Sequence, residues 1–250
     1  MHGALHGAWC WNVHFLDYFA QHGFEAHAVN LRGHGNSGGP RSLRWTRIAD
    51  YVEDLGNAAQ QLRASPVLIG HSLGGFVIEK YLEEHSVPAA VLLTTPPPSG
   101  LLPATLRIAR RHPLLFARIN LTLSLFPLVA TPTLAREAFF SKDLPEEQLL
   151  EYWRQMQDDS FLGFLDMVML DLPKAPKAGT PVLVLGAALD NMLDPTEIHA
   201  TARAYDTKAE IIPNVAHNMM LELRWQTVAD RVITWLKELE HLRRNSLDSP

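Results

Sequence analysis

The chain has 250 residues with 22 Lys and Arg against 27 Asp and Glu, a formal net charge of −5 at pH 7. This balance argues against a nucleic-acid-binding protein or one that binds an anionic membrane surface, because both interactions favour basic patches. Hydrophobic residues make up 47% of the chain, so most of it can fold around a core, and the single Cys10 excludes an intrachain disulfide. No basic-then-apolar signal pattern and no apolar segment of about 18 residues is present, so we expect a cytoplasmic protein without a membrane span.

Short apolar runs alternate with longer amphipathic segments along the chain, the pattern of βα units that build a parallel sheet. The apolar runs are nearly continuous, as strands covered on both faces require. Strands are predicted at 24–31, 66–71, 89–94, 181–186 and 209–213. Helices are predicted at 11–22, 47–64, 74–85, 195–205 and 222–240.

The alternation stops between 96 and 177, where the pattern is helical and both borders are dense in turn-forming residues. A helical insertion between two strands of one sheet predicts a cap over the carboxyl edge of that sheet. We therefore divide the chain into a core of residues 1–95 and 178–241, a cap of residues 96–177, and a flexible tail of residues 242–250.

A nucleophile turn is predicted at Gly70-His71-Ser72-Leu73-Gly74. This G-x-S-x-G pattern follows an apolar strand and precedes a helix, which is the context in which it presents a serine hydroxyl above a sheet. The N-terminus of that helix favours developing negative charge, and the Leu73 amide is expected to donate to an oxyanion. His71 holds the variable position of the motif, so its side chain is expected to point away from the site.

The motif GHSLGG, together with LRGHGNS at 31–37, resembles the α/β-hydrolase superfamily. The resemblance is strongest to the branch of small carboxylesterases, lysophospholipases, plant methyl-ester esterases, hydroxynitrile lyases and cofactor-free haloperoxidases. It implies an α/β-hydrolase fold, a mostly parallel sheet flanked by helices, and an oxyanion loop at HGALHGAW (2–9), where Ala4, with Leu5 as its neighbour, supplies the second amide. Only Met1 precedes that loop, so the N-terminal strands of the fold are expected to be missing.

In this fold the nucleophile is followed along the chain by an acid and then by a histidine base. His217, in NVAHNMML after the last predicted strand, holds the position of the base. The acid should follow the strand at 181–186, where both Asp190 and Asp194 are available. Asp194 directly precedes Pro195, an arrangement typical of a helix N-cap, so Asp190 is the preferred acid and Asp194 the alternative.

The predicted activity is hydrolysis of a carboxylic ester through an acyl-enzyme on Ser72, with a small-molecule ester substrate and no cofactor. A G-x-G-x-x-G match at Gly33–Gly38 is rejected as a dinucleotide site because no helix begins there, and no metal-binding motif occurs. Two alternatives stay open. One is another reaction on the same triad, namely perhydrolysis, C–C hydrolysis, thioester or amide cleavage, or a lyase reaction that would favour a lysine such as Lys142 or Lys174. The other is a non-catalytic ligand-binding protein.

Apolar residues of the predicted cap are candidates for an acyl pocket. They are Leu114, Leu115, Phe116, Leu125, Phe126, Phe139, Phe140, Phe161 and Phe164. Because such residues more often pack a cap onto its sheet, sequence alone does not say which of them face a substrate.

Overall fold

The computed structural model describes residues 1–39, 43–174 and 179–247, and of residues 243–247 the main chain only. Its centre is a sheet of four parallel strands in the order β1-β2-β3-β4. The strands are β1 (Leu68–His71), β2 (Ala90–Leu93), β3 (Val182–Ala187) and β4 (Ala209–Ile212). The prediction of a parallel sheet is therefore confirmed, with Ile69 beside Val91 and Val91 beside Leu183 across the ladders.

Alternate residues of the central strands face two helical layers. On one side of the sheet, Val91 and Leu93 pack with the first two helices and the last one. On the other side, Ala90 and Leu92 pack with the helices around the nucleophile strand. Because β2 and β3 are covered on both faces, their sequences are continuously apolar, which is why they could be recognised.

Helices α1 (Trp9–Asn12), α2 (Phe15–Gln21) and α11 (Trp225–Leu247) form the first layer. Helices α3 (Ile48–Gln60), α4 (Leu73–Tyr81) and α10 (Pro195–Ala204) form the second, and a 3₁₀ turn at Leu43–Trp45 precedes α3. The helix predicted at 11–22 is broken in two at Val13 and His14.

Residues 24–31, predicted as a strand, pair with no strand among the described residues. A strand is defined by its ladder, and a cavity separates this segment from the unpaired edge of β1, so no ladder forms between them. The prediction was wrong here because alternating apolar residues, of which only Leu31 is buried in this segment, do not show that a partner strand is present.

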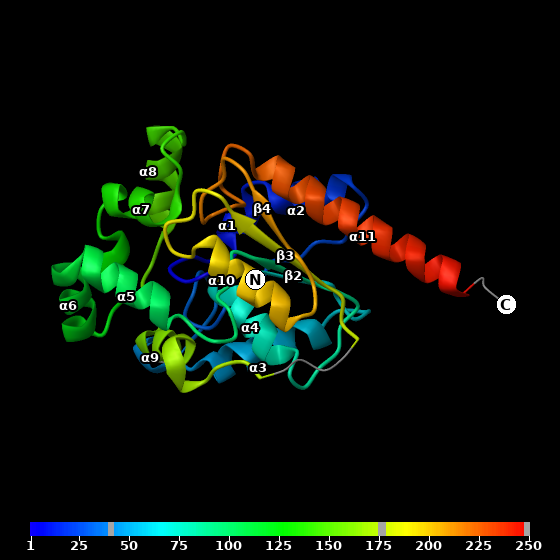
Figure 1. Ribbon diagram of the computed structural model, residues 1–250, viewed down its shortest axis with the longest axis horizontal. Coiled ribbons are helices and arrows are strands. Elements are labelled where there is room, and N and C mark those ends of the chain that lie inside the picture. The colour runs from blue at the N-terminus through cyan, green and yellow to red at the C-terminus, as the bar shows by residue number, and fades with distance from the viewer. Residues whose placement is uncertain (40–42, 175–178, 248–250) are drawn as a thin grey trace.

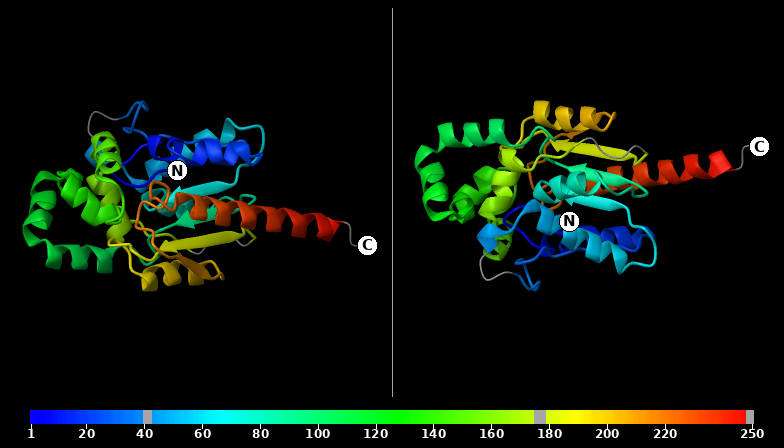
Figure 2. Two further views of the ribbon diagram at one scale, coloured as in Figure 1. Left: turned by 90° about the horizontal axis from the view of Figure 1, so that it is seen from above. Right: turned by 90° about the horizontal axis from the view of Figure 1, so that it is seen from below.

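The described part of the segment between β2 and β3 consists of helices joined by turns and loops, without a strand (Figure 1). It contains α5 (Leu102–Arg111), α6 (Pro113–Thr122), the 3₁₀ helix η2 (Phe126–Val129), α7 (Pro132–Phe139), α8 (Glu146–Gln155), α9 (Phe161–Leu165) and a π-helix at Asp166–Leu170. Figure 2 shows these helices gathered at one end of the sheet, with α11 extending past the other. The predicted boundary between residues 177 and 178 falls outside the described residues.

Helix α11 continues to Leu247, so residues 242–247, expected as part of a flexible tail, are helical. The sequence HLRRNSL contains no proline or glycine that would end a helix earlier. Residues 248–250 lie outside the described part of the chain. Within the described residues, no helix is both long and apolar enough to cross a bilayer.

Candidate active site

Ser72 lies on the tight turn between β1 and α4. Its backbone has φ 51° and ψ −118°, a conformation that L-residues rarely adopt, and its N–H donates to the Leu93 carbonyl at 3.0 Å. A Cβ atom added at Gly70 would lie 2.6 Å from the Gly74 carbonyl oxygen, closer than real contacts allow. The glycines of the motif therefore permit the close backbone approach that places a strained serine at the sheet edge.

His217 and Asp190 are joined by a hydrogen bond of 2.8 Å from His217 Nδ1 to Asp190 Oδ2. Both side chains are almost fully buried, at 3% and 1% exposure. An ionised carboxylate can only accept, so Nδ1 donates this hydrogen bond and Nε2 is the ring nitrogen left for a substrate or nucleophile. The other oxygen of Asp190 accepts from the amides of Met192 and Leu193, which holds the carboxylate in place.

Asp194 has a different environment. Its side chain accepts from the amides of Thr196 and Glu197 at the start of α10, and Pro195 is the first helical residue. The prediction that Asp194 is an N-cap is confirmed, and of the two aspartates Asp190 is the one hydrogen-bonded to His217.

The amides expected to bind an oxyanion differ in their availability. Leu73 is the first residue of α4, so its N–H has no intrahelical acceptor. The Ala4 N–H makes no hydrogen bond within the described structure, whereas the Leu5 N–H donates to Asp159 Oδ2 at 2.9 Å. Of these two loop amides, Leu5 is therefore occupied and Ala4 is free.

Ser72 and His217 line one small cavity of about 90 Å³, together with Ala4 and Leu5. No hydrogen bond joins Ser72 to His217 in the described residues. The remaining lining is mostly apolar, and four of the predicted cap residues contribute to it: Phe116, Leu125, Phe139 and Phe164. Leu114, by contrast, is 86% exposed, and Phe140 and Phe161 are buried in the core.

Residues 1–231 match the family described as the alpha/beta hydrolase family. The chain belongs to this family. The parallel sheet and the serine turn are those of an α/β-hydrolase, as the resemblance of the motifs implied.

Among curated proteins, methyl jasmonate esterase 1 of Vitis vinifera is 33% identical over 104 residues. The match spans 39% of this chain and 39% of that protein. Solved structures of similar fold match a larger share of this chain than the curated protein does. A thermophilic esterase from Thermogutta terrifontis has a TM-score of 0.72 at 18% identity, covering 95% of this chain and 88% of its own.

Two further structures are similar. A protein from Mycobacterium tuberculosis, provisionally assigned as the non-heme bromoperoxidase BpoC, has a TM-score of 0.78 at 18% identity, covering 96% of this chain and 91% of its own. A methylesterase from Arabidopsis has a TM-score of 0.67 at 20% identity, covering 99% and 97%. At these identities the structures show the fold and not the substrate.

Asp159 of this α/β-hydrolase was missed by sequence reasoning. It comes from the segment before α9 and is 1% exposed, yet it accepts hydrogen bonds from the Leu5 amide, His34 Nε2 at 3.2 Å and the Tyr51 hydroxyl at 3.2 Å. Burial alone would raise the pKa of Asp159, but the charge of His34 and these hydrogen bonds hold it below its usual value. Burial opposes charge on His34 too, but Asp159 raises the pKa of His34 above 6.5. The buried pair fixes the loop of residues 2–9, the predicted oxyanion loop, against the helical segment.

His71 does not point away from the site, contrary to the prediction. Its Nε2 donates to the His217 carbonyl at 2.9 Å, and the Thr94 hydroxyl donates to the same oxygen at 3.1 Å. Burial and the neighbouring His217 hold the pKa of His71 well below its ordinary value, so the ring is neutral. The turn that carries the serine thereby positions the loop that carries the histidine.

Neither lysine nominated for a lyase reaction lines the cavity, and both Lys142 and Lys174 are exposed. The described residues also contain no group of three or more His, Cys, Asp or Glu side chains arranged to hold a metal ion.

Proposed function

We propose that this α/β-hydrolase is a serine carboxylic-ester hydrolase that forms an acyl-enzyme on Ser72. The observation that carries the proposal is the buried His217–Asp190 hydrogen bond at the wall of the cavity that Ser72 also lines. A histidine whose Nδ1–H is bound by a carboxylate has its other nitrogen free to take a proton, which is what a serine nucleophile requires.

The proposed reaction has two steps. Ser72 Oγ attacks the ester carbonyl while His217 Nε2 takes its proton, and the amides of Leu73 and Ala4 donate to the oxyanion. His217 then gives the proton to the leaving alcohol, and the acyl group stays on Ser72. In the second step water gives a proton to His217 and attacks the acyl carbon. The bond from Ser72 Oγ to the acyl group then breaks, His217 returns the proton to Ser72 Oγ, and the carboxylic acid leaves, while Asp190 stabilises the imidazolium of each step.

The cavity walls support an apolar acyl group as the part of the substrate that is bound. Side chains from α5, α6 and α9 enclose the space beside Ser72, including Ile108, Phe116 and Phe164. The volume of about 90 Å³ favours short acyl chains in this conformation. The partial relative from Vitis vinifera is named for the methyl ester of jasmonic acid, so methyl esters of apolar acids belong in the first substrate panel.

The test combines covalent labelling with turnover. Wild type, Ser72→Ala and the matched control Ser86→Ala, an exposed serine outside the cavity, are treated with a fluorophosphonate probe and assayed on p-nitrophenyl acetate, butyrate and octanoate. We expect label on Ser72 in wild type and control, and loss of both label and turnover in Ser72→Ala.

Two outcomes contradict the proposal. One is a folded wild-type protein that neither takes the label nor turns over any ester, which would favour a ligand-binding protein. The other is turnover that persists in Ser72→Ala, which would place the nucleophile elsewhere.

A further inference from the structure

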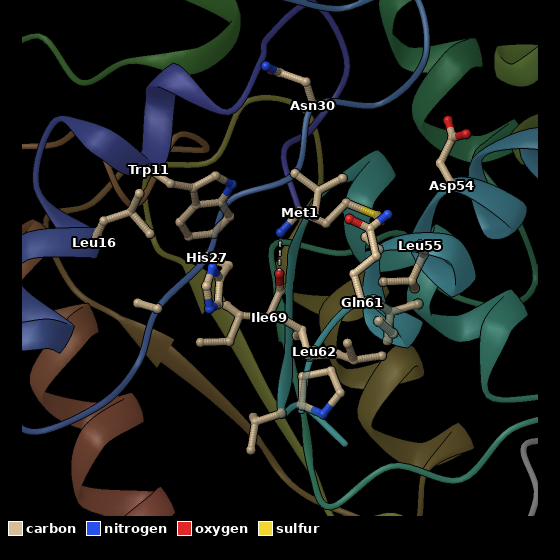
Figure 3. A pocket seen from close by; sticks show the side chains of 18 of the residues that line it. Met1, Trp11, Leu16, His27, Asn30, Asp54, Leu55, Gln61, Leu62 and Ile69 are labelled. Atoms are coloured by element: carbon tan, nitrogen blue, oxygen red, sulfur yellow. Dashed lines mark hydrogen bonds between the residues drawn. The ribbon is translucent and has the colours of Figure 1, made fainter. Parts of the chain in front are cut away.

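Two helices of the segment between β2 and β3, α5 and α6, expose leucines to solvent beside the proposed active site. They lie at the end of the molecule where the helices of this segment gather, away from the projecting end of α11 (Figure 2). A cavity of about 670 Å³ between β1 and residues 24–30, which Trp11, Leu16 and Leu62 help to line, is a separate feature (Figure 3). No residue of α5 or α6 lines that cavity, so the exposed leucines form a surface of their own.

Each of these two helices has an inner and an outer side. On the inner side, Ala104 and Ile108 of α5 and Phe116 of α6 line the small cavity that Ser72 also lines. On the outer side, exposed residues recur three or four positions apart, which places them on one face of each helix. These exposed residues are Leu102, Leu106 and Arg110 on α5, and Leu114, Arg118 and Leu121 on α6. We call these six residues the α5–α6 face.

The leucines of the α5–α6 face make up two apolar stripes on helices that follow one another directly, since only His112 stands between α5 and α6. Leu114 and Leu121, on the second stripe, are 86% and 85% exposed. Single exposed apolar residues are ordinary on a protein surface, but a group of them marks a site of interaction with another molecule. We therefore expect a partner that takes up leucine side chains.

The charge of this part of the chain is opposite to the charge of the whole. Residues 101–136 contain five arginines and no Asp or Glu, in a chain whose net charge is −5. Three of the arginines form ion pairs with acidic residues outside this stretch, namely Arg107, Arg111 and Arg136. Arg110 and Arg118 belong to the α5–α6 face and form no ion pair with any of the described residues. Their positive charge is therefore available to an anionic partner.

We propose that the α5–α6 face docks on an anionic lipid surface, where its leucines enter the layer between headgroups and acyl chains and its arginines meet the phosphates. Helices that lie in a membrane interface combine apolar side chains with Lys or Arg in this way. Each basic residue near an anionic lipid surface adds to the binding. The net charge of the whole chain argues against such a surface, but the α5–α6 face itself carries only positive charge.

A lipid surface fits the shape of this face. Leu114 and Leu121 project almost completely from their helix, so a folded protein would need a pocket for each of them, whereas fluid acyl chains close around single side chains. Docking also brings the proposed active site next to the lipid, because the inner sides of α5 and α6 line the cavity of Ser72. Amphiphilic esters held in the lipid are then the substrates nearest to Ser72. This use of the surface rests on the proposed function, whereas the docking itself does not.

Docking is tested by binding of the purified protein to vesicles, measured by co-sedimentation without any ester substrate. One set of vesicles contains phosphatidylcholine and phosphatidylglycerol in equal parts, and the other contains phosphatidylcholine alone. We expect saturable binding to the mixed vesicles and at least fivefold weaker binding to phosphatidylcholine alone. Most of the binding should be lost at high salt, because salt screens exposed charges.

Two double variants locate the binding surface. Leu114→Ser with Leu121→Ser removes the two most exposed leucines, and Arg110→Gln with Arg118→Gln removes the charge of the α5–α6 face. Each double variant should weaken binding to the mixed vesicles at least fivefold. Because all four side chains are exposed, both variants should fold as wild type does.

Matched controls change the same residue types outside the segment between β2 and β3. Leu223→Ser with Leu242→Ser removes two other exposed leucines, and Arg63→Gln with Arg203→Gln removes the same amount of charge from other exposed positions. Each control should change binding to the mixed vesicles less than twofold.

A second measurement tests whether docking delivers substrate to Ser72. The variant Leu114→Ser with Leu121→Ser should hydrolyse soluble p-nitrophenyl butyrate at the rate of wild type, and p-nitrophenyl palmitate held in mixed vesicles at least threefold more slowly. Equal rates of the two proteins on the embedded ester would refute delivery. If wild type hydrolyses neither ester, the proposed function is refuted, and vesicle binding still decides the docking.

Three results would overturn the docking. The first is a wild-type protein that binds the mixed vesicles no better than phosphatidylcholine alone. The second is a loss of binding in the control variants as large as in the variants of the α5–α6 face, which would place the lipid contact elsewhere. The third is a dimer in sedimentation equilibrium that Leu114→Ser with Leu121→Ser dissociates, which would mean that a second copy of this chain covers the face.

Discussion

Replacing Asp159 by Asn tests how the proposed oxyanion loop, residues 2–9, is held. All four groups around its carboxylate are donors: the amides of Leu5 and Ser160, the Tyr51 hydroxyl and His34. An amide side chain can accept on one oxygen only, and its NH₂ must face two of these donors. His34 can present a lone pair and the Tyr51 hydroxyl can rotate, but a backbone N–H cannot change its role. One of the two backbone amides therefore loses its acceptor.

The cost follows from these contacts. A buried donor left without a partner costs about 1–3 kcal/mol. Breaking a buried ion pair can cost about 3–5 kcal/mol, but His34 can shed its proton near neutral pH, which relieves most of that cost. We expect Asp159→Asn to lose about 2 kcal/mol of stability at pH 7. If the Leu5 amide is the one released, the loop shifts and kcat falls roughly 10- to 100-fold, part of the effect of losing one oxyanion donor.

The assay compares urea denaturation with steady-state ester hydrolysis, each rate corrected for the folded fraction. Tyr51→Phe is the control, because it removes a donor to Asp159 without touching the oxyanion loop. It should lose about 1 kcal/mol of stability and keep its kcat. The reasoning is refuted if Asp159→Asn is destabilised as expected while its kcat and KM equal those of wild type. Asp159 would then stabilise the fold without positioning the loop.

Three more outcomes are expected. Asp190→Asn should lower kcat by roughly 10⁴-fold, because His217 loses the carboxylate that fixes its tautomer. Asp194→Asn keeps an N-cap, so its kcat should stay within about twofold of wild type. Equal losses of kcat in ester assays of the two variants would contradict the assignment of Asp190 as the acid. The buried Cys10 thiol, whose pKa is raised by burial to about 12, should react with a disulfide reagent only on unfolding, so fast labelling in native buffer would be contrary. The free energy of unfolding should fall as the pH drops below 6.5, because three buried histidines stay neutral in the folded protein and take up protons in the unfolded chain. Each of these histidines should lower it by about 1.4 kcal/mol per pH unit. A flat stability profile between pH 6.5 and 4 would refute this. Burial lowers the pKa of these residues to about 3 for His2, to about 4 for His6 and well below 6.5 for His71.

Much of the fold could be predicted because its signals are local. Neighbouring residues alone identify the apolar runs of β1, β2 and β3 and the strand–turn–helix around Ser72. The choice between two aspartates was also local, since Asp194 directly precedes Pro195, an arrangement typical of a helix N-cap. Excluding Asp194 in this way left Asp190 as the acid candidate.

The contacts that position the site could not be predicted in the same way. Asp159 binds the Leu5 amide across 154 residues, and His71 donates to the His217 carbonyl across 146 residues. No spacing in the sequence encodes such distances. From sequence, a lone aspartate in a helical segment is expected to lie on the surface. A histidine beside the nucleophile is expected to occupy a variable position without a role in the site.

The sequence by itself determined where parallel strands form and which serine occupies the sharp turn, because apolar periodicity and glycine placement act over a few residues. Only the tertiary structure decided which polar side chains meet, and whether the apolar run at 24–31 has a neighbour to pair with. Hydrophobicity is a property of each residue by itself, whereas a strand ladder or a buried ion pair exists only when two distant segments fold against each other.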